Sequence, residues 1–106
     1  MKPPAFDYVR AESVEEALAA LAEADGEARV LAGGQSLGPM LNLRLAMPEF
    51  VVDIGRIPDL AGVSWDGAAV TVQAGTPQAA LLSDPALAAR QPLLAAAMPW
   101  IGHVQT

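Results

Sequence analysis

The chain has 106 residues, of which 53% are hydrophobic and 17% charged, a composition that excludes intrinsic disorder and fits one small domain or part of a larger one. Its formal net charge of −6 and its lack of cysteine exclude a basic nucleic-acid-binding surface, a disulfide and an iron–sulfur cluster held by this chain. No apolar run reaches the ~20 residues of a spanning helix, and no secretory signal opens the sequence, so we expect a cytoplasmic protein without a membrane span.

The first part of the chain alternates predicted helices and strands. Ser13 and Glu16 fit a capping box, in which Glu16 reaches back to the N-cap, and they predict a helix that ends before Gly26. A short apolar run predicts a buried strand over residues 28–32. Apolar residues at helical spacing then predict a second helix over residues 37–45.

The rest of the chain predicts a hairpin and several short helices. Residues 50–54 predict a second strand, and Asp66-Gly67 between two strand-like runs predicts a type I′ hairpin turn. Thr76-Pro77 predicts a helix with Thr76 as its N-cap. Further prolines divide the helical stretch up to Met98 into short segments. This order of elements predicts an α/β (α+β) fold rather than an all-α one.

The segment between the first predicted strand and the second predicted helix is the candidate binding site. Adjacent glycines allow the backbone to approach a ligand closely, and successive amides next to a helix N-terminus favour a phosphate or pyrophosphate. A tight turn without any ligand is an equally good interpretation of the local sequence. The segment consists of Ala32, Gly33, Gly34, Gln35, Ser36 as N-cap, Leu37, Gly38 and Pro39.

Two common nucleotide motifs do not match this segment. A P-loop needs a lysine after its last glycine, and no lysine follows Lys2. A dinucleotide-binding fingerprint would need glycine where Gln35 stands. Asp53 reads as an ordinary strand-end carboxylate, and His103 has no serine or acid arranged around it, so we expect no catalytic residue and no metal site.

Several stretches, taken in order, resemble the FAD-binding medium subunit of molybdenum hydroxylases, the carbon monoxide dehydrogenase and xanthine dehydrogenase group. The most specific is Ala-Gly-Gly-Gln-Ser-Leu at residues 32–37, followed by Pro-Met-Leu-Asn-Leu-Arg-Leu at residues 39–45. The supporting stretches are residues 6–8, 13–18, 52–54, 57–60, 92–94 and 101–103. The resemblance covers nearly the whole chain.

This resemblance implies the N-terminal part of a vanillyl-alcohol-oxidase-type (PCMH-type) FAD-binding domain, incomplete at its C-terminal side. Residues 1–60 would form the first α/β subdomain and residues 61–106 the start of the second. Residues 32–39 would form the first of two loops that hold the FAD pyrophosphate, and Ile101 would pack near the flavin. Electrons would come from a molybdenum-binding large subunit through an iron–sulfur small subunit, and would leave to an external acceptor.

One departure from the family pattern affects these expectations. The second glycine motif of the family, Thr-x-Gly-Gly, would follow Thr106. We therefore expect the chain to be an N-terminal portion that is inactive alone, binds FAD weakly or not at all, and self-associates through exposed strand edges. Two alternative functions remain, a non-catalytic α/β association module and a stand-alone FAD-dependent oxidase of the same fold.

Overall fold

The computed structural model describes residues 1–102, so the predictions that concern His103 and the residues up to Thr106 lie outside the described residues. The chain divides into two compact units, Met1–Asp59 and Leu60–Thr106. Within the described range, every helix is too short or too polar to cross a membrane. Both units combine strands and helices, which confirms the predicted mixed α/β class.

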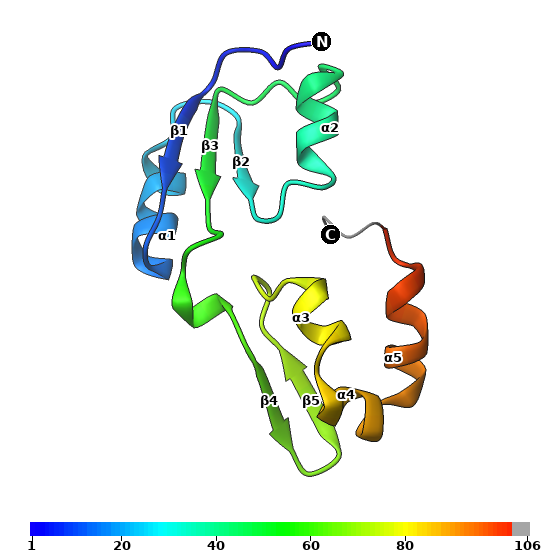
Figure 1. The fold of residues 1–106 in the computed structure, drawn as a ribbon. Helices are drawn as coiled ribbons and strands as arrows, with labels where there is room; N and C mark the ends of the chain where they lie inside the picture. Colours follow the sequence, from blue (N-terminus) through cyan, green and yellow to red (C-terminus); the bar gives the residue numbers. More distant parts are fainter. Residues whose placement is uncertain (103–106) are drawn as a thin grey trace. The chain divides into compact units, whose positions relative to one another are not determined.

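The first unit is built on a three-stranded parallel sheet (Figure 1). Its strands, in spatial order, are β1 (Asp7–Arg10), β3 (Phe50–Asp53) and β2 (Ala28–Leu31). Helices α1 (Val14–Glu23) and α2 (Leu37–Asn42) connect them in sequence. The central strand carries the core, because Val51 and Val52 are fully buried.

The order of the strands indicates where a ligand is expected to bind to this unit. The chain passes from β1 over β3 to β2, then turns back to β3. The two connections therefore run in opposite directions across the sheet. Open parallel sheets bind ligands outside the carboxyl ends of their strands, at the point where the connections diverge. The loop between β2 and α2 starts at that edge.

Two strands differ from the sequence prediction. Strand β1 was not predicted, because all four of its residues are exposed and show no apolar run. Backbone pairing holds it instead, with the Asp7 N–H donating to Glu49 O over 2.9 Å and the register pairing Tyr8 with Val51. Strand β2 was expected to be buried, but it lies at the edge of this sheet and Val30 is 45% exposed.

The two helices of the first unit are close to the prediction. Ser13 caps α1 as predicted, since its Oγ accepts from the Glu16 N–H over 3.1 Å. The Glu16 carboxylate, however, accepts from the Glu12 N–H over 2.8 Å rather than reaching back to Ser13. Helix α2 ends at Asn42, short of the predicted residue 45, because the next turn contains Arg44 at φ 57, in the left-handed region.

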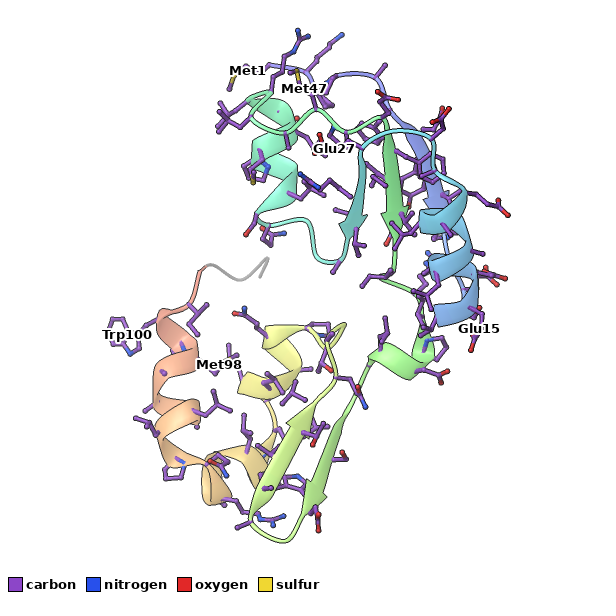
Figure 2. All side chains as sticks on the ribbon, turned by 180° about the vertical axis from the view of Figure 1, so that it is seen from behind. Met1, Glu15, Glu27, Met47, Met98 and Trp100 are labelled. Atoms are coloured by element: carbon purple, nitrogen blue, oxygen red, sulfur yellow. The ribbon has the colours of Figure 1, made fainter. Side chains whose placement is uncertain are left out.

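The second unit packs a hairpin against short helices (Figure 1). Its core is formed by Leu81, Leu87 and Met98, with Trp65 among the side chains packed against them. Figure 2 shows Met98 turned inward and Trp100 turned outward, in agreement with exposed fractions of 4% and 88%. The elements are β4 (Val63–Asp66), β5 (Ala69–Val72), α3 (Gln78–Leu82), α4 (Pro85–Arg90) and α5 (Pro92–Ala97), with 3-10 turns η1 (Pro58–Leu60) and η2 (Met98–Trp100).

The hairpin turn lies one residue later than predicted. Asp66 pairs with Ala69, so the two loop residues are Gly67 and Ala68. Within the described residues, only the first of these has a positive φ, of 56°, which is the arrangement of a type II′ turn rather than type I′.

Helix α3 begins later than predicted, at Gln78, with Pro77 rather than Thr76 as its N-cap. The Thr76 hydroxyl instead holds the start of the hairpin. Its Oγ1 accepts from the Gly62 N–H over 2.9 Å and donates to the Gly62 carbonyl oxygen over 2.9 Å. A threonine before a proline therefore ties two segments together here, rather than opening the helix.

Removing the cap of α4 is expected to destabilise the second unit. The Asp84 Oδ1 accepts from the N–H groups of Ala86, over 2.8 Å, and Leu87, over 3.4 Å. Asp84→Ala should therefore lower the free energy of unfolding by about 1 kcal/mol, the usual effect of losing an N-cap. Urea unfolding measures this loss. Ser36→Ala is the control, because the hydroxyl of that N-cap makes no cap hydrogen bond, and equal losses in both variants would contradict the prediction.

Candidate functional site

The candidate site is the loop that leaves the carboxyl end of the edge strand β2 and enters α2 (Figure 1). Gly34 has φ +74, a conformation that side-chain-bearing residues rarely adopt. The Gly38 N–H donates to the Gly34 carbonyl over 2.8 Å, and the Gln35 Nε2 donates to the Gly33 carbonyl over 3.2 Å. These two bonds engage the carbonyl groups of the glycine pair and leave its amides open.

Within residues 1–102, none of the N–H groups from Ala32 to Leu37 donates to a protein oxygen. Nothing lies within 4 Å of a Cβ built on Gly33, so the space beside that residue is open. These residues are exposed or partly buried, so their amides are accessible to solvent or to a ligand, and consecutive free amides at a glycine turn are the donors that bind anions.

The predicted site residues occupy this loop and the first turn of α2. Ala32, Gly33, Gln35, Ser36 and Pro39 are exposed, whereas the others are partly buried: Gly34, Leu37 and Gly38. Helix α2 has only six residues, so the amides of the loop, rather than the helix dipole, are the main feature that favours an anion. Ile101 belongs to the other unit and is 47% exposed, and its role near a flavin stays a prediction.

Sequence reasoning missed a second group of residues at the same edge of the sheet. The Asp53 Oδ1 accepts from the Gly55 N–H over 2.8 Å, and the Asp53 Oδ2 accepts from the Tyr8 hydroxyl. The Ile54 N–H donates to the Leu31 carbonyl over 2.9 Å. An aspartate two residues before a glycine is a signal for such a turn, whereas nothing in the sequence pointed to Tyr8, because β1 was not predicted.

The hydrogen bond to Asp53 raises the pKa of the Tyr8 phenol above its ordinary value, together with slight desolvation and the charge of Asp53. Arg10 and Arg56 lower this pKa and do not cancel the effect. The phenol therefore keeps its proton at neutral pH and acts as a donor. Its stabilising contribution is present below the ordinary tyrosine pKa, and is lost as the pH rises through the higher pKa of the folded state.

Comparison with known proteins identifies one family. A family model described as the FAD-binding domain in molybdopterin dehydrogenase matches residues 4–106. The chain is 46% identical over 105 residues to the carbon monoxide dehydrogenase medium chain of Hydrogenophaga pseudoflava, a match that covers 99% of this chain and 37% of that protein. It is 44% identical over 105 residues to subunit alpha of the 6-hydroxypseudooxynicotine dehydrogenase complex of Paenarthrobacter nicotinovorans, covering 99% and 36%.

A solved structure gives the same result. Carbon monoxide dehydrogenase from Hydrogenophaga pseudoflava, in a form that lacks the Mo-pyranopterin moiety of its molybdenum cofactor, superposes with a TM-score of 0.92 at 46% sequence identity. The match covers 99% of this chain and 37% of that one. The chain thus spans little more than a third of the length of the relatives that it matches.

Proposed function

Because this chain belongs to the family of FAD-binding domains in molybdopterin dehydrogenases, we propose that it holds the flavin of a medium subunit that accepts electrons from iron–sulfur clusters and passes them to an external acceptor. The family that the sequence resembles, and the FAD that this resemblance implied, are confirmed by the match over residues 4–106. The route of the electrons is our proposal. Bound FAD supplies the electron-transfer chemistry, and the residues of this chain hold and orient it.

The observation that carries the proposed binding mode is the run of open amides from Ala32 to Leu37. We place the FAD diphosphate against them, since hydrogen bonds to a charged group contribute roughly 1.5–3 kcal/mol each. The exposed Ser36 hydroxyl can add a donor, while Gly38 and Pro39 shape the exit of the loop. That Ile101 packs near the flavin is a separate part of the proposal, which rests on the family resemblance alone. No acid–base pair is required, because the group that reacts belongs to the cofactor.

The partners in this proposal are an iron–sulfur small subunit and a molybdenum-binding large subunit. The names of the relatives support an assembly of several chains, since one is a medium chain and another is a subunit of a dehydrogenase complex. We also propose that this chain works in the cytoplasm, that it is inactive alone, and that it binds FAD weakly because this loop supplies only part of the contacts to the diphosphate.

Binding of the diphosphate predicts which ligands compete with FAD for this chain. ADP carries the same diphosphate as FAD, whereas riboflavin carries none, so ADP should displace FAD from this chain and riboflavin should not. Titration followed by FAD fluorescence measures this competition. We expect the Kd of this chain for FAD to lie above the micromolar range. Displacement by riboflavin alone would show that the isoalloxazine ring, not the diphosphate, is recognised. A submicromolar Kd in a monomeric chain would contradict the proposed weak binding.

A further inference from the structure

The carboxyl end of β3 is joined to both neighbouring strands by contacts beyond the strand pairing. Tyr8 on β1 pairs with Val51 in the register, so its side chain lies on the same face as Asp53, two residues further along β3. The Tyr8 hydroxyl donates to one oxygen of the Asp53 carboxylate, and the other oxygen accepts from the Gly55 N–H. One carboxylate thus ties β1 to the turn that follows β3.

The same turn lies against the start of the glycine loop. The Ile54 N–H donates to the Leu31 carbonyl over 2.9 Å. A Cβ built on Gly55 would lie 3.1 Å from the Asp53 Oδ1 and 3.9 Å from the Ala32 carbonyl oxygen. A side chain at this position would therefore crowd the carboxylate, and it would meet the first residue of the loop at an ordinary van der Waals distance. The turn at residues 53–55 is thus adjacent to the first residue of the glycine loop.

We propose that Tyr8 and Asp53 are positioning residues for diphosphate binding, because their hydrogen bonds hold the turn at residues 53–55 against the first residues of the glycine loop. Neither residue touches the ligand in this proposal. The inference rests on the proposed function, since the loop it acts on is the one assigned to the diphosphate. The competing interpretation is a bond between strands that leaves the loop unaffected.

The charges around the phenol agree with this role. Asp53 raises the pKa of Tyr8, whereas Arg10 on the same strand and Arg56 after the turn lower it. The phenol consequently stays protonated and donates throughout the neutral range. Because the chain contains a single tyrosine, its titration can be followed directly by the absorbance of tyrosinate. Asp53→Asn should move that titration to lower pH, which would show in solution, independently of any ligand, that the Asp53 carboxylate lies beside the phenol.

The decisive variant is Tyr8→Phe, which keeps the aromatic ring and removes only the hydroxyl. In ¹⁵N–¹H NMR spectra we expect the amide resonances of Gly33 and Gly34 to shift, and the Kd for ADP to rise about two- to tenfold, the usual range for one lost hydrogen bond. Asp53→Asn should produce the same two changes. Asp7→Asn, an exposed carboxylate on the same strand, is the control and should produce neither.

Each result decides between the interpretations. Unchanged Gly33 and Gly34 resonances in Tyr8→Phe, with or without bound ligand, would overturn the proposal. Shifted resonances together with an unchanged Kd for ADP would overturn it as well. Shifted resonances in a protein that does not bind ADP at all would support the coupling of Tyr8 to the loop. The failure to bind ADP would, however, contradict the proposed function of the loop.

Discussion

Replacing Gly33 with valine is expected to weaken FAD and ADP binding strongly while leaving the free energy of unfolding nearly unchanged. A Cβ at this position meets no protein atom within 4 Å, so the folded chain can accommodate the new side chain. The same open space is where the proposed diphosphate approaches the loop amides. Overfilling a close contact costs about 1–3 kcal/mol, which corresponds to roughly a 5- to 150-fold rise in Kd.

The matched control is Ala5→Val, which enlarges an exposed residue of the same unit outside the loop. Titration with ADP gives the Kd of both variants, and urea unfolding gives their stabilities. We expect only Gly33→Val to bind more weakly, with both proteins as stable as the wild type. An unchanged Kd in Gly33→Val would show that the ligand does not approach this glycine.

Replacing Leu87 with alanine is expected to cause the largest loss of stability in the second unit. Leu87 is fully buried and packs with Leu81 and Met98. Removing a buried leucine side chain costs about 2–5 kcal/mol, because apolar contacts are lost and a cavity remains. The core of a unit this small rarely contributes more than about 3–5 kcal/mol. We therefore expect the second unit of this variant to unfold in little or no urea.

Tryptophan fluorescence measures this loss, since Trp65 packs against the same cluster. Leu93→Ala is the control, because Leu93 on α5 is 84% exposed. Surface substitutions usually change stability by no more than about 0.5 kcal/mol. A Leu87→Ala protein as stable as Leu93→Ala would mean that the helices of the second unit do not pack on the hairpin in solution.

Elements with strong local signals were predicted well. Ser13 at the start of α1 is a capping signal whose partner lies within four residues, and Pro85 at the start of α4 is one of the prolines that divide the helical stretch. Strand β1 has no such signal, since its exposed residues are held by pairing with β3, more than forty positions away. The hairpin turn was misplaced by one residue, because the register of the two strands, and not the Asp66-Gly67 pair alone, decides which residues turn.

In the candidate site, too, the features with local sequence signals were predicted, and the features that depend on long-range pairing were not. Adjacent glycines at positions 33 and 34 marked the loop in the sequence, and the structure adds that its amides have no protein partner within residues 1–102. The bond from Tyr8 to Asp53 joins residues 45 positions apart. Its existence depends on the pairing of β1 with β3, which brings the two side chains to one face of the sheet. Local patterns cannot reveal such a contact.

We propose that the main-chain donors from Ala32 to Leu37 bind the diphosphate of FAD. A ¹⁵N–¹H NMR titration of this chain with ADP and with FAD tests it most directly, because each amide reports its own hydrogen bonding. The predicted result is that both ligands shift the same loop resonances and approach saturation together. Ligand-induced shifts confined to other residues, with the amides of the loop unchanged, would contradict the claim.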